Sequence, residues 1–287
     1  MSALLKVVAD AATAPAQAPL PRRAAAAAIR GRARTAPAAL LPWALPLAML
    51  AVWEGASLAG LIPLRVLPAP TDVARAAWRL MLSGELVRNI WVSFCRAAVG
   101  FVIGGGIGFV LGLANGVSQL SEKLFDSTLQ MLRNIPHLAL IPLVILWFGI
   151  DEEAKLFLVA LGVFFPVYIN TLHGIRSVDP QLVEMGRSYG MSAATLFRQV
   201  ILPGALPSIF VGLRYALGIC WLTLIVAETI AASSGIGYMA MQAREFLLVD
   251  VVVLSIVIYA LLGKLADSTA RLLERLCLAW HPAFQSR

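Results

Sequence analysis

The side chains that could do chemistry in this chain are a few charged residues inside long apolar stretches. Arg96 lies in one such stretch, and Arg214 and Glu228 lie in another. A charged group inside a membrane marks a functional site by default, because removing it from water is costly. Arg96 could attract an anion, or contact the backbone or a lipid headgroup. Arg214 could line a pathway or extend its flexible stem to the membrane surface, and Glu228 is expected to reach water.

Motifs for catalysis and for nucleotide binding are missing from the sequence. It has no G-x-x-x-x-G-K-[ST] loop to hold phosphates and no nucleophile elbow or carboxylate dyad. Its three cysteines lack metal-ligand spacing, and neither His137 nor His173 has a Cys or carboxylate partner at such spacing. We therefore expect no catalytic residue, no metal and no cofactor, which indicates a conduit rather than an enzyme.

The composition is that of a membrane protein. Of 287 residues, 60% are hydrophobic and 14% are charged, which is more apolar surface than a soluble protein could bury. The formal net charge of +7 could suggest nucleic acid. Because positive charge is also typical of the cytoplasmic edges of membrane spans, we expect a lipid bilayer as the partner and no nucleic acid.

Six apolar stretches are each about 20 residues long, which is enough to cross a bilayer. They cover residues 40–62, 89–113, 127–149, 154–174, 207–230 and 249–272. Pro136 and Pro142 lie in the third, where they predict a kink or break. The break could line a pathway or be a packing irregularity. Amphipathic pieces are expected at about 71–88, along the membrane surface, and within 233–247.

The stretches divide the chain into four parts. Residues 1–38 are rich in Ala, Pro and Arg and are expected to be disordered. They resemble a transit peptide in being rich in Arg and poor in acidic residues, although a cytoplasmic tail before a long apolar span fits better. Residues 39–88 form the first span and its amphipathic connector, 89–272 the core domain, and 273–287 a cytoplasmic tail.

Arginine placement predicts that both termini and the segment 179–203 lie in the cytoplasm. One link departs from this rule. Four arginines lie between the first two spans, in a connector that we expect at the outer surface: Arg65, Arg75, Arg79 and Arg88.

Small residues recur along two of the spans. Gly100, Gly104, Gly108 and Gly112 follow one another every four residues, and Gly212 and Ala216 repeat that spacing in the fifth span. Such a stripe lets another helix approach closely. The partner helix could belong to the same chain or to a second copy.

The segment 179–203 is amphipathic and lies between two spans. Asp179 is expected to cap a short helix with Pro180 at its first position, and Gly190 to end that helix in a left-handed conformation. Ser192 is expected to cap a second short helix, which Pro203 ends. The segment therefore predicts a helical finger exposed to a watery compartment.

This segment resembles the "EAA" signature of the permeases of binding-protein-dependent ABC importers. The matching positions are Glu184, Gly190, Leu202 and Pro203; Gly186 stays small, whereas Met185 departs from the pattern. The stretches 131–150, 221–247 and 259–284 are similar to the permease subunits of aliphatic-sulfonate importers, in the nitrate, sulfonate and taurine class. The likeness spans roughly 40–284.

The resemblance implies an all-α membrane protein of the type I, MetI-like importer fold in a bacterial inner membrane. It further implies a permease homodimer, two cytoplasmic ABC ATPase subunits and an extracytoplasmic solute-binding protein. The signature segment would be the coupling helix that contacts the ATPase. We expect eight residues to form that contact: Glu184, Arg187, Gly190, Ser192, Leu196, Phe197, Leu202 and Pro203.

Leu196 and Phe197 are the expected apolar anchors of this contact, and Glu184 and Arg187 its polar fixings. Taurine, nitrate or a pyrimidine precursor would leave similar traces in such a permease. An ion-coupled secondary transporter and a membrane scaffold without transport are the alternatives of a different class.

Overall fold

The computed structural model describes residues 36–63 and 65–280, and this part of the chain is helical with short links. Most of the tail expected at 1–38, and the end of the tail expected at 273–287, lie outside the described residues. The elements are α3 (Ala36–Leu58), α4 (Pro70–Leu82), α5 (Glu85–Val117), α6 (Gln119–Arg133), the 3-10 turn η1 (His137–Leu140), α7 (Ile141–Phe148), α8 (Glu152–Arg176), α9 (Pro180–Ser188), α10 (Ala193–Leu196), the π-helical turn η2 (Phe197–Ile201), α11 (Leu202–Ala231), α12 (Ile236–Glu245) and α13 (Val249–Cys277). The chain divides between Trp53 and Glu54 into two compact units, and helices α4 to α13 all belong to the second.

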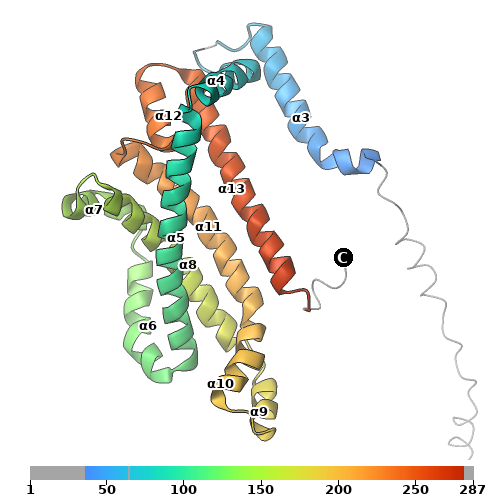
Figure 1. Cartoon of the computed structure of the whole chain (residues 1–287), viewed down its shortest axis with the longest axis vertical. Helices are drawn as coiled ribbons and strands as arrows, with labels where there is room; N and C mark the ends of the chain where they lie inside the picture. The colour runs from blue at the N-terminus through green and yellow to red at the C-terminus, as the bar shows by residue number, and fades with distance from the viewer. Residues whose placement is uncertain (1–35, 64, 281–287) are drawn as a thin grey trace, which may run out of the picture. The chain divides into compact units, whose positions relative to one another are not determined.

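Four helical stretches of the described chain are long and apolar enough to cross a membrane: α5, α8, residues 193–230 and α13. The bent pair of α6 with η1 and α7 makes a fifth if it counts as one span, and α3 contributes a shorter apolar helix, Ala44–Leu58. The stretches expected at 89–113, 154–174, 207–230 and 249–272 each lie within one of these long helices (Figure 1).

The third expected span is broken, as its prolines predict. Its two helical parts meet at 81°. Pro136 precedes η1 and Pro142 occupies the first turn of α7. The stretch between the second and third expected spans is mostly helical, and Ser118 caps α6 there by accepting a hydrogen bond from the Ser121 N–H at 3.3 Å.

The amphipathic connector is shorter than expected. Helix α4 ends at Leu82, and Gly84, with φ of 76°, turns the chain into α5. A left-handed residue interrupts a helix, and glycine adopts that conformation without the Cβ clash. Arg88 consequently belongs to the first turns of α5 and not to the connector.

The glycine stripe of α5 packs on α8 of the same chain. A Cβ at Gly104 would collide with the backbone of Ala160, and one at Gly108 would lie 2.5 Å from the Phe164 carbonyl oxygen. Gly100 and Gly112 also lie against α8. The absence of side chains is thus what lets these two helices approach so closely.

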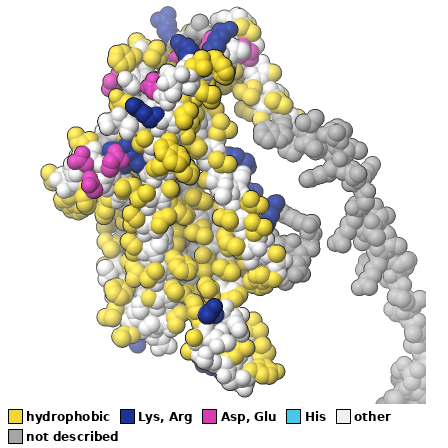
Figure 2. Space-filling view, in the orientation of Figure 1, with side chains coloured by type: hydrophobic (Ala, Val, Ile, Leu, Met, Phe, Trp, Pro, Cys, Tyr) yellow, Lys and Arg dark blue, Asp and Glu magenta, His cyan; other side chains and the backbone are white. Residues whose placement is uncertain are grey.

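The opposite side of α8 packs on α11. A Cβ at Gly212 would lie 2.5 Å from the Asn170 Cβ, and Ala216 is fully buried. Helix α8 is therefore the inner helix of the bundle, between α5 and α11. Figure 2 shows hydrophobic side chains over the flank of the long helices, as a lipid-facing surface requires.

Candidate functional site

A helical hairpin joins α8 to α11 at one end of the bundle (Figure 1). Asp179 accepts a hydrogen bond from the Gln181 N–H at 2.9 Å, with Pro180 at the first helical position of α9. Gly190 has φ of 75°, and Ser192 accepts from the Thr195 N–H at 3.3 Å to start α10. These local features agree with the sequence-based prediction.

Leu196 packs between the two arms of this hairpin, which are α9 and the helix that begins with α10. Its side chain is 5% exposed and lies against Gly186, where an added Cβ would be 2.5 Å from the Leu196 Cδ1 atom. A residue buried inside the hairpin cannot anchor a partner protein, so Leu196 is not the surface anchor that we expected. Phe197 is half-buried, whereas Glu184 and Arg187 are exposed.

The exposed apolar surface of the hairpin lies on α9 instead. Leu182, Met185 and Tyr189 are 46%, 51% and 79% exposed, and their spacing of three and four residues puts them on one helix face. We call these three residues the α9 face. Met185, which departs from the signature, is therefore an exposed residue and not a packing position.

Pro203 does not end the second arm, contrary to the prediction. Phe197 to Ile201 form a π-helical turn, Leu202 continues the helix, and Pro203 occupies the first turn of α11. The Leu202 N–H donates to the Phe197 carbonyl oxygen five residues back, and this wider turn lets the helix continue through Pro203. Residues 193–230 consequently form one continuous helix, so the second arm is an extension of a membrane-spanning helix.

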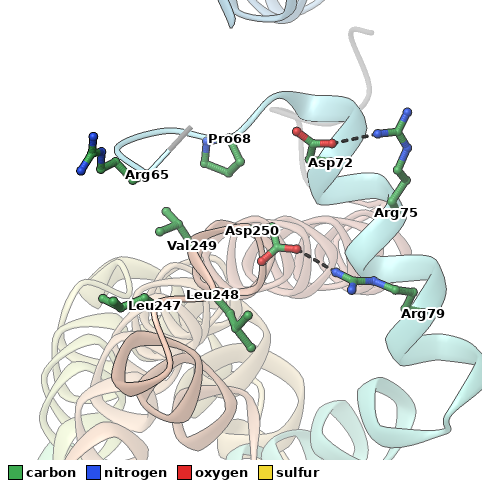
Figure 3. A pocket seen from close by; sticks show the side chains of 9 residues that line it. All are labelled: Arg65, Pro68, Asp72, Arg75, Arg79, Leu247, Leu248, Val249 and Asp250. Atoms are coloured by element: carbon green, nitrogen blue, oxygen red, sulfur yellow. Dashed lines mark hydrogen bonds and ion pairs between the residues drawn. The ribbon is translucent and has the colours of Figure 1, made fainter. Parts of the chain in front are cut away.

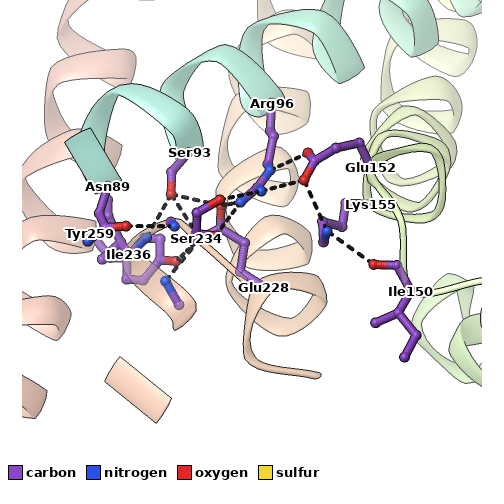
Figure 4. Close-up of polar contacts among 12 residues, drawn as sticks. Asn89, Ser93, Arg96, Ile150, Glu152, Lys155, Glu228, Ser234, Ile236 and Tyr259 are labelled. Atoms are coloured by element: carbon purple, nitrogen blue, oxygen red, sulfur yellow. Dashed lines mark hydrogen bonds and ion pairs between the residues drawn. The ribbon is translucent and has the colours of Figure 1, made fainter. Parts of the chain in front are cut away.

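A buried polar network lies toward the other end of the bundle (Figure 4). Its centre is Glu228, which is 1% exposed and does not reach water as we expected. The carboxylate accepts hydrogen bonds from Ser93 Oγ and Arg96 Nη1 at 2.8 Å, from the Gly237 N–H at 2.9 Å and from Tyr259 Oη at 3.0 Å. Helix α12 covers it by folding back over the end of α11.

Arg96 is paired on both edges of its guanidinium. Its Nε and Nη2 atoms donate to the Glu152 carboxylate at 2.6 Å, and Nη1 also donates to the Ser234 carbonyl oxygen at 2.6 Å. Lys155 donates to Glu152 at 3.2 Å. Two cations therefore face two carboxylates, so Arg96 is held by charges of the protein itself and does not present a free anion site.

The same network fixes the start of α12. The N–H groups of Gly235, Ile236 and Gly237 donate to Asn89 Oδ1, Ser93 Oγ and Glu228, respectively, each at 2.9 Å. Helix starts leave such groups unpaired, and here side chains of α5 and α11 pair three of them. Asn89 and Ser93 were not predicted from the sequence; their only signal is a four-residue spacing on one face of α5.

The other predicted pathway residues take separate positions. Arg214 pairs with Asp267 at 3.4 Å and with Glu274 at 2.6 Å, which joins α11 to α13. Pro136 and Pro142 lie in the bent pair, where His137 Nε2 lies 2.9 Å from Thr223 Oγ1 of α11. That contact was also missed. Among the described residues, no group of three or more His, Cys, Asp or Glu could hold a metal ion.

Comparison with known proteins supports this fold and places the chain among transport proteins. Residues 104–277 match the family described as binding-protein-dependent transport system inner membrane component. The chain is 63% identical to the Escherichia coli protein named "Putative aliphatic sulfonates transport permease protein SsuC", over 85% of this chain and 92% of that one. It is 47% identical to the Bacillus subtilis protein of the same name, over 84% and 87%.

One solved structure, titled as an amino acid ABC transporter with histidines, has the same fold. Its TM-score is 0.58, with 20% sequence identity over 69% of this chain and 97% of that one.

Proposed function

Because this chain belongs to the family of inner membrane components of binding-protein-dependent transport systems, we propose that it forms the membrane pathway of an ATP-driven importer of aliphatic sulfonates. The observation that supports this choice of substrate is the 63% identity to the Escherichia coli protein named as an aliphatic sulfonates transport permease, over 85% of this chain. The protein itself does no chemistry, and ATP hydrolysis belongs to a partner subunit.

The family implies ATPase subunits and a solute-binding protein as partners. We propose two copies of this chain, two ATPase subunits in the cytoplasm and the binding protein on the opposite side. Both termini and the α9–α10 hairpin then lie in the cytoplasm, in a bacterial inner membrane. The exposure of the α9 face supports it as the apolar contact with the ATPase, and Glu184 and Arg187 lie exposed nearby as polar fixings.

The helix connections suggest how ATP binding reaches the pathway. The hairpin continues into α11 without a helical break and follows α8 after a short link. Closing of the ATPase subunits would move the hairpin, and α8 and α11 would follow. An outward-facing state is favoured only if the docked hairpin makes contacts that differ between nucleotide states. The binding protein would then release the sulfonate into the opened pathway.

Uptake of a labelled alkanesulfonate tests the substrate. A strain that lacks this gene should lose uptake, regain it with the wild-type chain and lose it again on ATP depletion. Unlabelled taurine and nitrate serve as competitors. Uptake that survives ATP depletion would indicate an ion-coupled transporter, and stronger competition by taurine or nitrate than by alkanesulfonate would replace the proposed substrate.

Two variants test the docking surface. Met185→Asp and Tyr189→Asp put a charge on the α9 face, and we expect both to abolish substrate-stimulated ATP hydrolysis while membrane insertion is normal. Ala194→Asp is the matched control, because it adds the same charge at an exposed position of α10, in a first turn that tolerates acidic residues. Equal activity of all three variants would contradict the assignment.

A further inference from the structure

A basic cavity of about 580 Å³ lies at the end of the bundle that carries α4 and α12 (Figure 3). Three segments line it: the link before α4, one face of α4, and the end of the α12–α13 link with the first residues of α13. The lining residues are Arg65, Pro68, Asp72, Arg75, Arg79, Leu247, Leu248, Val249 and Asp250. The lining contains three arginines and two aspartates, so it has a net positive charge.

The arginines keep donors for a ligand. Arg75 Nη1 donates to Asp72 at 2.9 Å, and Arg79 Nη2 donates to Asp250 at 2.9 Å. A guanidinium carries five N–H groups in a planar fork that matches phosphate oxygens, and each of these ion pairs engages one. Both arginine side chains remain more than two-thirds exposed, at 76% and 68%. Asp72 and Asp250 therefore orient the two guanidinium groups without using up their hydrogen-bonding capacity.

Helix α4 presents a second exposed surface beside this cavity, and that surface is apolar. One face of α4 is buried through Val73 and Ala76. Trp78, Met81 and Leu82 point elsewhere and are 64%, 52% and 73% exposed. A helix with a buried face, an apolar exposed face and a basic face fits the membrane interface, where Trp lies at the level of the lipid headgroups and Arg contacts their phosphates.

These observations favour a lipid over an acidic protein as the occupant. A protein that bound the arginines alone would leave Trp78, Met81 and Leu82 in water, at a cost that grows with the apolar area. A phospholipid satisfies both surfaces, because its phosphate meets the guanidinium groups and its acyl chains meet the apolar residues. A bound phospholipid also explains why the connector before α5 carries several arginines, although the positive-inside rule would not place so many arginines at the outer surface.

We propose that this cavity binds the phosphate of an anionic phospholipid headgroup, with Arg75 and Arg79 as donors. The ion pair between Arg79 and Asp250 joins α4 to the start of α13, so the headgroup would lie at that junction. This site is independent of the transported substrate, so it stands or falls separately from the proposed function.

The test uses the purified permease–ATPase complex in detergent. Its melting temperature and the lipids retained in native mass spectrometry are measured with added phosphatidylglycerol or phosphatidylcholine. We expect phosphatidylglycerol to raise the melting temperature more than phosphatidylcholine does, and the double variant R75Q/R79Q to lose most of that shift. Arg88→Gln is the matched control, because Arg88 is exposed in α5 and is not among the lining residues; it should respond as the wild type does.

Three further measurements make the outcome decisive: a soluble headgroup, a lysine double variant, and binding of the solute-binding protein to the complex. Glycerol phosphate, the soluble headgroup, should give little shift, and an equal shift would overturn the lipid assignment in favour of a free-anion site. R75K/R79K keeps the charge but removes the fork, so it should keep only part of the response, and it replaces the Gln pair if that pair does not fold. Equal responses of wild type, R75Q/R79Q and R88Q would overturn the proposal. So would a double variant that binds lipid normally but loses the binding protein.

Discussion

Replacing Gly104 by alanine adds one methyl group where α5 meets α8, and we expect it to destabilise the protein. The nearest atoms to the added Cβ are the carbonyl oxygen, carbonyl carbon and Cα of Ala160. A flexible side chain could rotate away from the methyl group, but a helix backbone cannot. The two helices must therefore separate, and the tight packing along the glycine stripe is lost.

The magnitude follows from two opposing effects. Alanine in place of glycine stabilises a helix by about 0.5–1 kcal/mol, because glycine loses more conformational entropy on folding. Overpacking a tight interface costs about 1–3 kcal/mol, and the upper part of that range applies when backbone is the obstacle. We expect Gly104→Ala to lower the free energy of unfolding by about 2 kcal/mol. Gly106→Ala is the control, since nothing lies within 4 Å of its Cβ, and it should be neutral or stabilising.

Detergent-induced unfolding of the two purified variants measures this difference directly. The same helix carries both changes, so differences in helix propensity and expression cancel to first order. Gly105→Ala, whose Cβ would lie 3.6 Å from Val163, should fall near the control. If the Gly104 and Gly106 variants unfold alike, the α5–α8 contact is not the tight interface described above.

Three other predictions concern the hairpin and the buried charges. Gly190→Val should cost about 1–2 kcal/mol locally, because a β-branched L-residue is strained at φ of 75°, whereas Gly190→Asn should be tolerated. Substrate-stimulated ATP hydrolysis should therefore fall in the Val variant and not in the Asn variant. A fall in both variants would mean that something other than backbone strain is responsible. Glu228→Gln should destabilise the protein by about 3 kcal/mol, the low end for a broken buried ion pair, because Arg96 still pairs with Glu152. Thermal unfolding measures this, with Glu153→Gln at an exposed position as the control. Equal melting temperatures of the two variants would show that the network is not stabilising. Arg214→Met should cost about 1–3 kcal/mol, because Glu274, which is 14% exposed, loses its cation, whereas Asp267 keeps Arg271. Sulfonate uptake per folded protein then decides whether Arg214 contributes to the pathway. Unchanged uptake would show that it does not.

Hydropathy and local capping rules predicted the helices well because these signals are local. The apolar stretches gave four of the long helices, and Asp179, Gly190 and Ser192 gave the hairpin. Helix ends were less predictable. Pro203 lies where a proline usually ends a helix, yet the preceding π-helical turn lets the chain continue through it.

The polar network could not be predicted in the same way, because its partners are far apart in sequence. Arg96 and Glu228 are 132 residues apart, and Arg96 and Glu152 are 56 apart. Their pairing depends on how α5, α8 and α11 pack. Read singly, Glu228 near the end of an apolar stretch suggested contact with water. Only the fold of α12 over that end shows why this carboxylate is buried and what satisfies it.

The glycine contacts also bear on how movement spreads from the hairpin. Helix α8 has a tight interface on each side, with α5 through Gly104 and with α11 through Gly212. Such interfaces resist sliding, because any shift brings side chains against backbone. We therefore expect α5, α8 and α11 to move as one body when α9 is displaced. The bent pair of α6 and α7 is broken at Pro136 and rests on α11 in part through His137, so it is the element best placed to change its angle as the pathway opens.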